Sequence, residues 1–272
     1  MMNDENVNVE HVVALKDVVN PLLFPFQTTW KDKRILNIGG AAETLPVLEE
    51  QFPEAVVQQS DIEAVLADDF SAAPCDYIVA LGLKSSNCDF HQWMTRLLSS
   101  LTPGGAIAAG VYGYAGYYGL NMLSTIIKNF SADIDDISHQ KNFSRVMKVA
   151  KAVIAQLPAS HPARKQKAFM ERLEKGDKNA FRQLIYLSAD KIFTVSRLLD
   201  SIDACGGGLV DWVFPGYYNP ARYVEDTGTA EKLKALPEPW CWQVAELVGA
   251  WPPEHYFFVS KKAAPPILPP SF

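Results

Sequence analysis

Short apolar runs alternate with stretches of helical spacing over the first half of the chain. The runs of strand length cover residues 35–38, 55–59, 76–81 and 106–111. Between them, apolar residues recur with a helical period at 43–52 and 90–101. Strands that alternate with helices favour a parallel sheet that is covered by helices on both faces. We therefore predict an α/β fold that begins near residue 34.

From residue 112 to residue 193 the pattern changes to a helical period alone. Gly113, Gly116 and Gly119 recur at every third position at its start, which predicts irregular backbone there. No apolar run of strand type interrupts the segment, and its four predicted helices cover residues 120–130, 143–157, 164–173 and 179–187. We expect this segment to form a helical cap over the carboxyl edge of the sheet.

The α/β pattern resumes after the helical segment. The predicted elements are a helix at 194–204, a strand at 209–214, a helix at 238–248 and a last strand at 256–260. The predicted organisation is therefore a lead-in at 1–33 with a helix at 7–19, an α/β domain formed by 34–111 and 194–262, the helical cap at 112–193, and a proline-rich tail at 263–272.

Three segments of this pattern resemble class I S-adenosylmethionine-dependent methyltransferases. They are ILNIGG at 35–40, DYIVALG at 76–82 and LTPGGAIAAGVYG at 101–113. They are similar, in that order, to the family's glycine loop, its fourth strand, and its Pro-Gly-Gly turn with the fifth strand. We expect the Pro-Gly-Gly sequence to form the turn between the helix at 90–101 and the next strand. The resemblance implies a Rossmann-like sheet, S-adenosylmethionine as cofactor and methyl transfer as the activity.

The segment VYGYAGYYGLNML at 111–123 resembles a methyltransferase subgroup in which a glycine-rich stretch leads into a helical lid. An HP segment and a TVxxLL helix follow in that subgroup, and they compare with residues 161–162 and 194–199. The tyrosines at the carboxyl end of the strand are candidate substrate-binding residues that could also shield a sulfonium by cation–π contact. The alternative is that they pack between lid and sheet. They are Tyr112, Tyr114, Tyr117 and Tyr118.

The glycine loop departs from the family pattern acid-x-G-x-G-x-G. Asn37 stands in place of the acid, and Gly39 is kept. Ala41 and Glu43 stand where the next two glycines would be. Asn37 can form hydrogen bonds but cannot form an ion pair with the cofactor's ammonium group. Glu43 brings a side chain and a negative charge to a position where the backbone approaches the cofactor.

The interval between Ile38 and Asp76 has room for one intermediate strand, whereas the family usually has two. We therefore predict a sheet with one strand fewer than the family's usual seven. The shortening leaves the role of Asp61 open, because this residue follows the one intermediate strand. Three roles are open to Asp61. It could be the acid that binds the ribose hydroxyls, or it could belong to the later strand whose loop contacts the adenine. The third role is the N-cap of a short helix at 62–66.

Ligands of open α/β sheets bind beyond the carboxyl ends of the strands, where glycine allows the backbone to approach them closely. The cofactor is therefore expected over the two glycines that follow the first strand, with Asp61 near the ribose. The predicted cofactor-binding residues are Asn37, Gly39, Gly40, Ala41, Glu43, Asp61, Leu81 and Gly82. No pattern of nucleophile and base identifies a catalytic residue.

Composition narrows the choice of partners. The 272 residues carry a net charge of −6 without a run of Lys or Arg, which argues against nucleic acid. The four cysteines are widely spaced and form no short-spaced pair of the kind that zinc sites use, so no metal is expected. No apolar run reaches the length of a membrane helix and no signal peptide is visible, which favours a cytoplasmic location.

Two functions fit the sequence. The first is a methyltransferase that acts on a small molecule or a peptide. The second is a catalytically inactive relative that serves as a binding or regulatory partner. A protein partner or a homodimer is expected as a possibility beside the substrate. The residues that separate them are Ala41 to Glu43, because an active enzyme must leave this loop open to the cofactor. A nicotinamide-dependent oxidoreductase would need G-x-G-x-x-G, which the sequence GGAAET at 39–44 does not supply.

Overall fold

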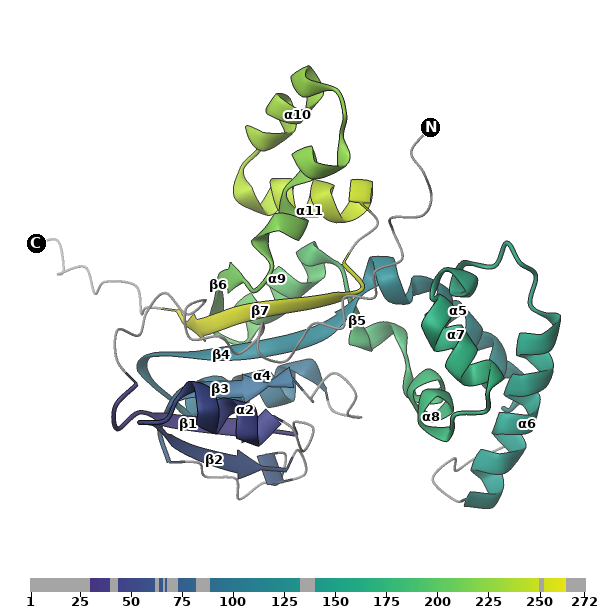
Figure 1. Cartoon of the computed structure of the whole chain (residues 1–272), viewed down its shortest axis with the longest axis horizontal. Coiled ribbons are helices and arrows are strands. Elements are labelled where there is room, and N and C mark those ends of the chain that lie inside the picture. The colour runs from purple at the N-terminus through teal and green to yellow at the C-terminus, as the bar shows by residue number, and fades with distance from the viewer. Residues whose placement is uncertain are drawn as a thin grey trace, which may run out of the picture.

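The computed structural model of the chain describes residues 30–39, 44–61, 64–65, 67, 73–81, 89–132, 140–249 and 252–262. The helix predicted at 7–19 and the proline-rich tail at 263–272 lie outside these residues. The described part is a mixed α/β structure around a seven-stranded sheet (Figure 1). The predicted fold class is therefore confirmed.

The sheet has the strand order β2, β1, β3, β4, β7, β6. These strands are β2 (Val56–Ser60), β1 (Arg34–Ile38), β3 (Cys75–Ala80), β4 (Leu101–Gly113), β7 (Glu254–Lys261) and β6 (Gly207–Trp212). The first four strands run parallel, and β7 is antiparallel to both β4 and β6. The two-residue strand β5 (Ile192–Phe193) pairs with the end of β4.

The interval after the first strand holds one strand among its described residues, as its length predicted. Of the residues that the structure describes between Ile38 and Cys75, only those of β2 form a strand. The sheet as a whole has seven strands, and not the six predicted from that interval. The seventh strand, β5, was not expected, and it extends the sheet beside the end of β4 rather than beside β2.

Alternation along the strands separates the two faces of the sheet. The covering helices are α2 (Thr44–Gln51), α4 (Phe90–Ser99) and α9 (Val195–Ala204). Leu36 and Ile78 are buried in one cluster with apolar residues of α4 and α9. Ile35 and Tyr77 are buried in another cluster with α2, on the opposite face. The sheet is therefore covered on both sides, as the alternating pattern predicted.

The Pro-Gly-Gly sequence lies inside β4, and not before it as expected. Leu101 already pairs with β3, and regular pairing resumes at Ala106 after a bulge. Gly104 has a φ of +79°, which favours glycine. A Cβ at Gly105 would lie 2.9 Å from the carbonyl oxygen of Asp76. The two glycines therefore allow a bulge within the strand that keeps β4 close to β3.

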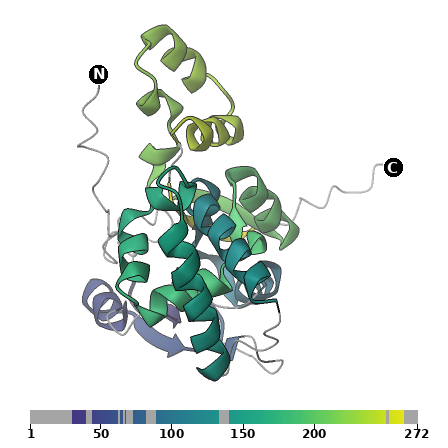
Figure 2. The ribbon, with the colours of Figure 1, turned by 90° about the vertical axis from the view of Figure 1, so that its right-hand side faces the viewer.

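The helical segment lies beyond the carboxyl end of β4 (Figure 1), and Figure 2 views the molecule from its side. Its elements are α5 (Tyr114–Phe130), α6 (Gln140–Gln156), η4 (Pro162–Lys165), α7 (Lys167–Glu174), α8 (Lys178–Tyr186) and η5 (Ala189–Lys191). Leu123, Phe181 and Ile185 belong to a buried cluster formed almost wholly by this segment. The segment is helical as predicted, apart from β5 at its end.

Two glycines at the start of the segment have a different role from the one expected. α5 begins at Tyr114, so Gly116 and Gly119 belong to a regular helix and not to irregular backbone. A Cβ at Gly116 would lie 2.3 Å from the Cα atom of Pro253. A Cβ at Gly119 would lie 2.4 Å from the backbone nitrogen of Ala163. The glycines therefore allow α5 to pack directly on neighbouring backbone.

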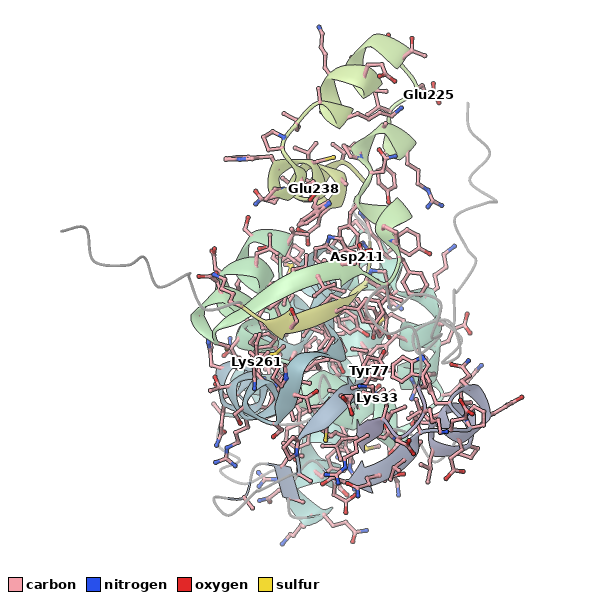
Figure 3. All side chains as sticks on the ribbon, turned by 90° about the vertical axis from the view of Figure 1, so that its left-hand side faces the viewer. Lys33, Tyr77, Asp211, Glu225, Glu238 and Lys261 are labelled. Carbon is pink, nitrogen blue, oxygen red and sulfur yellow. The ribbon has the colours of Figure 1, made fainter. Side chains whose placement is uncertain are left out.

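A second group of helices stands between β6 and β7. It consists of η6 (Pro215–Tyr218), η7 (Pro220–Tyr223), α10 (Thr227–Lys234) and α11 (Glu238–Gly249). Figure 3 shows Glu225 and Glu238 of this group above Asp211 of β6. Only α11 was predicted from the sequence, because the stretch before it has no sustained helical period.

Buried hydrogen bonds connect this second group to the sheet. The Nε2 atom of His255 lies 3.0 Å from the carbonyl oxygen of Phe193. Because a carbonyl oxygen can only accept, Nε2 donates this bond, and Nδ1 lies 2.8 Å from the hydroxyl of Tyr218. Oε2 of Glu246 in α11 accepts a 2.9 Å hydrogen bond from the N–H of Val195. These bonds attach η6 and α11 to β7 and to the start of α9.

Candidate functional site

The parallel strands β1, β2, β3 and β4 end at one edge of the sheet, on the side of the helical segment (Figure 1). Gly39 follows β1 with a φ of +58°, in the left-handed region that favours glycine. Its N–H donates a 3.2 Å hydrogen bond to the carbonyl oxygen of Ser60 at the end of β2. The backbone therefore turns away from β1 at this glycine while it remains joined to β2.

Asn37 is the polar side chain that the structure buries completely near this edge. Neither its Oδ1 nor its Nδ2 atom has a hydrogen-bond partner in the described part of the chain. Asn37 pairs in register with Val79, which pairs with Ala108, so the three side chains share one face of the sheet. An unpaired buried amide costs about 1–3 kcal/mol. Such a cost is expected where a side chain serves a ligand.

Asp61 and Leu81 follow the ends of β2 and β3. Asp61 is exposed, and its backbone carbonyl accepts a 3.2 Å hydrogen bond from the N–H of Val65, so a helical turn begins here. Residues 62 and 63, to which an N-cap at Asp61 would connect, lie outside the described part of the chain, so the N-cap alternative stays a prediction. Leu81 is half-buried. The structure thus brings Asn37, Gly39, Asp61 and Leu81 to the same edge of the sheet.

The other predicted cofactor residues lie outside the described part of the chain. They are Gly40, Ala41, Glu43 and Gly82. Their roles in a cofactor site stay predictions.

Tyr112 and Tyr117 form an aromatic pair with ring centres 4.3 Å apart. The hydroxyl of Tyr117 donates a 3.2 Å hydrogen bond to Oε1 of Glu254, and the hydroxyl of Tyr256 donates to Oε2. Glu254 pairs with Tyr112 across β4 and β7. The Tyr256 ring covers Gly110, where a Cβ would lie 2.8 Å from the ring. We call Tyr112, Tyr117, Glu254 and Tyr256 the tyrosine–glutamate cluster.

The hydroxyls of the tyrosine–glutamate cluster are held neutral. Burial raises the pKa of Tyr112, Tyr117 and Tyr256, and the negative charge of Glu254 raises it further. A neutral hydroxyl donates a hydrogen bond, which the carboxylate accepts. Residues 37, 79 and 108 share a face with positions 110 and 112, so the cluster continues the face of Asn37 toward the end of β4.

The four tyrosines that the sequence singled out divide into two pairs. Tyr112 and Tyr117 belong to the buried cluster. Tyr114 and Tyr118 lie on the outer surface of α5, with 44% and 41% of their surface exposed and ring centres 5.2 Å apart. Glu254 was missed, because its place opposite Tyr112 depends on the antiparallel pairing of β7 with β4. A sequence signal for that pairing is absent from the local pattern.

The described residues contain neither a metal cluster nor a membrane-spanning helix. Among them, no three His, Cys, Asp or Glu side chains gather in a way that could hold a metal ion. None of the helices in the described part is both long enough and apolar enough to span a membrane. His161 accepts a 3.1 Å hydrogen bond at Nδ1 from the N–H of Ala163 and so caps η4, as a loop residue before a helix does.

Comparisons with solved structures agree with this fold. The chain is similar to PKMT2 from Rickettsia typhi in complex with AdoHcy, with a TM-score of 0.61, 15% identity, and coverage of 92% of this chain and 53% of that chain. A second PKMT2 structure gives a TM-score of 0.60 and 14% identity, with coverage of 92% and 54%. The cyclopropane synthase MmaA2 from Mycobacterium tuberculosis is less similar, with a TM-score of 0.39, 12% identity, and coverage of 92% and 84%.

The chain spans about half the length of the PKMT2 chain that it matches. No protein-family model matches the sequence. At this level of identity the similarity shows the fold alone. The chain therefore shares a Rossmann-like α/β fold with the part of PKMT2 that it matches.

Proposed function

We propose that this protein binds S-adenosylmethionine at the carboxyl edge of the sheet and transfers its methyl group to a small molecule or a peptide. The observation that carries the proposal is Asn37, a completely buried amide without a partner among the described residues, two positions before the left-handed turn at Gly39. PKMT2, which has the same fold, was solved in complex with AdoHcy.

The residues present at the edge fit this cofactor. The exposed carboxylate of Asp61 would accept hydrogen bonds from the two ribose hydroxyls. Leu81 would pack against the adenine, and Gly39 leaves the backbone open to close approach. Asn37 would offer its amide to the methionine part of the cofactor. An amide can donate and accept at once, so it can meet either an ammonium or a carboxylate group.

When bound, the cofactor supplies an electrophilic methyl group on a sulfonium. The chain then has to align the acceptor and exclude water. The tyrosine–glutamate cluster is placed to do this, since it lies on the same face at the end of β4. Glu254 would hold a hydrogen-bond donor of the acceptor, such as an amine, while Tyr117 and Tyr256 orient its carboxylate. The helical segment would cover this site.

A non-catalytic binding partner is the second candidate. Ala41 and Glu43 stand where the family has glycines, and each adds a side chain to the loop that approaches the cofactor. A protein of this kind would keep the fold without holding S-adenosylmethionine. The two candidates differ in one measurable property, which is cofactor affinity.

Titration calorimetry with S-adenosylmethionine and S-adenosylhomocysteine tests the proposal. We expect both to bind, and we expect Asp61→Asn to weaken binding by about tenfold through the lost charge-assisted hydrogen bonds. Asp200→Asn, a change at an exposed position of α9, is the matched control and leaves binding unchanged. If millimolar cofactor gives neither heat nor a thermal shift, the proposal of a methyltransferase is wrong and the proposal of a non-catalytic binding partner takes its place.

Transfer itself is tested with S-adenosylmethionine that carries a labelled methyl group. The wild-type protein is incubated with a cell extract divided into small-molecule and protein fractions. We expect the label to appear in one of the two fractions. Label in the small-molecule fraction would identify the acceptor as a small molecule, and label in the protein fraction would identify it as a peptide or protein. Cofactor binding without label in either fraction would mean that the protein holds the cofactor but is not a methyltransferase.

A further inference from the structure

The helical segment has a charge opposite to that of the whole chain. Residues 140–191 contain twelve Lys and Arg against four Asp and Glu, a net charge of +8, whereas the whole chain carries −6. This concentration is not visible as a run, because the basic residues are spread over α6, η4, α7, α8, η5 and the turn before α8. Folding brings some of them together.

A groove between α6 and α8 collects four of these cations. It has a volume of about 410 Å³, and both of its walls are basic. Lys148 and Lys151 come from α6, and Lys178 and Arg182 come from α8. A Cβ at Gly176 would lie 3.4 Å from Nζ of Lys151, so this lysine reaches the turn that leads into α8. α6 forms the side of the molecule that faces the viewer in Figure 2.

The four acids of residues 140–191 are engaged elsewhere. Glu174 pairs with Arg164 at 2.5 Å, Asp177 pairs with Arg172 at 2.7 Å, and Glu171 lies 3.9 Å from Lys175. The fourth acid, Asp190, has its pKa lowered by a hydrogen bond from Ser188. None of these acids faces the groove.

The groove cations therefore lack a counter-charge within the described residues. Neighbouring like charges on helices destabilise each other, and a concave site of one sign raises the local concentration of the opposite ion.

The floor of the groove is apolar and aromatic. Phe143, Met147 and Tyr186 line it, and the guanidinium of Arg182 lies 5.3 Å above the centre of the Phe143 ring. The cation–π contact holds the guanidinium over the floor with its N–H groups free to bind oxygen. Lysine ammonium groups and a guanidinium around an apolar floor suit an anion that is attached to an apolar body.

We propose that the groove between α6 and α8 is a second binding site, for a small phosphate ester with an aromatic or apolar body. The volume lies in the range of small-molecule pockets, and it is too small to require a macromolecular partner. The phosphate would contact Lys148, Lys151, Lys178 and Arg182, and the body would rest on Met147 and Tyr186. The site uses none of the residues of the proposed cofactor site, so it does not depend on methyl transfer.

Phenyl phosphate is the probe, with inorganic phosphate and phenol as partial probes. By calorimetry in low-salt buffer, we expect phenyl phosphate to bind more tightly than inorganic phosphate, and phenol not to bind. Added salt should weaken the binding, because exposed charges are screened. Saturating S-adenosylhomocysteine should leave the affinity for phenyl phosphate unchanged. Competition between the two would overturn the proposal of a separate site.

The double variant Lys151→Gln/Arg182→Gln should bind phenyl phosphate at least about tenfold more weakly than the wild type. Lys175→Gln, at an exposed position of the same segment outside the groove, is the control and should bind as the wild type does. Circular dichroism shows whether both variants are folded. Equal affinity in the folded double variant, or no binding by the wild type, overturns the proposal.

Two further ligands test whether the groove binds a larger anionic partner and not a small phosphate ester. They are a short RNA and vesicles that contain phosphatidylglycerol. If either binds, loses its affinity in the double variant and is not displaced by phenyl phosphate, the groove serves a macromolecule or a membrane surface and the proposal is wrong. Displacement by phenyl phosphate supports the small-molecule site.

Discussion

The hydroxyl of Tyr117 donates a 3.2 Å hydrogen bond to Oε1 of Glu254, and so joins the first turn of α5 to the start of β7. The two residues are far apart in the sequence, and both lie where β4 ends. The bond therefore closes the tyrosine–glutamate cluster between the helical segment and the sheet.

Tyr117→Phe should lower the free energy of unfolding by about 1 kcal/mol, because it removes one donor from a part-buried carboxylate. Affinity for S-adenosylhomocysteine should stay unchanged, since the hydroxyl belongs to the proposed acceptor side. Urea denaturation and calorimetry measure the two quantities. Tyr114→Phe is the control at an exposed ring and should change neither. A loss of affinity for S-adenosylhomocysteine in Tyr117→Phe would mean that the tyrosine–glutamate cluster binds the cofactor and not the acceptor.

Gly39→Arg should abolish binding of S-adenosylhomocysteine. The left-handed φ of +58° disfavours any side chain, and an arginine here would fill the space in which the cofactor is proposed to lie. Gly228→Arg in α10 is the control, because a Cβ there meets only Asp226 Oδ2 at 3.5 Å. Calorimetry and a thermal shift with the ligand measure the effect. Wild-type affinity in a folded Gly39→Arg protein would move the cofactor site away from this edge.

Gly119→Ala should lower the free energy of unfolding by about 2–3 kcal/mol, because its Cβ would meet backbone atoms of Pro162 and Ala163 that cannot move aside cheaply. In an ordinary helix the same change stabilises by up to about 1 kcal/mol. Gly228→Ala provides that ordinary case in α10. Thermal and urea unfolding of the two variants should therefore give opposite signs. A stabilising effect at position 119 would contradict the close packing of α5 on η4.

Asp76 should make stability depend on pH in the acid range. Burial alone would raise the pKa of this carboxyl, but hydrogen bonds from the N–H of Arg34 and from Lys33 outweigh burial and the pKa is lowered. Figure 3 views the molecule from the side on which β1 and β3 begin, and Lys33 is labelled there. The stabilising contribution is complete above the ordinary aspartate pKa of about 4 and is lost as the pH falls through the lowered value.

Urea denaturation of wild type and Asp76→Asn checks that expectation. At neutral pH the variant should be less stable by about 1 kcal/mol, a modest value because Lys33 is one-third exposed and its charge is partly screened. The difference should shrink as the pH falls below about 4. A difference that does not change with pH would show that the amide replaces the carboxylate contacts fully.

Local patterns in the sequence were sufficient for most of the α/β part. The apolar runs at β1 and β3 and the helical spacing at α4 and α9 depend on the periods of strand and helix, which are properties of neighbouring residues. The positions of Asn37, Gly39, Asp61 and Leu81 at one edge follow from the same patterns, because parallel strands bring their carboxyl ends together. The single described strand between β1 and β3 followed from the length of that interval.

Tertiary structure alone decided the rest. Glu254 meets Tyr117 because β7 pairs with β4 in one register, and the clash at Gly119 exists because η4 packs on α5. Lys151 and Arg182 line one groove because α6 and α8 lie side by side. Each of these contacts joins residues that are distant in the chain. Local periodicity carries no information about which distant surfaces meet, since their meeting is selected by the packing of the whole core.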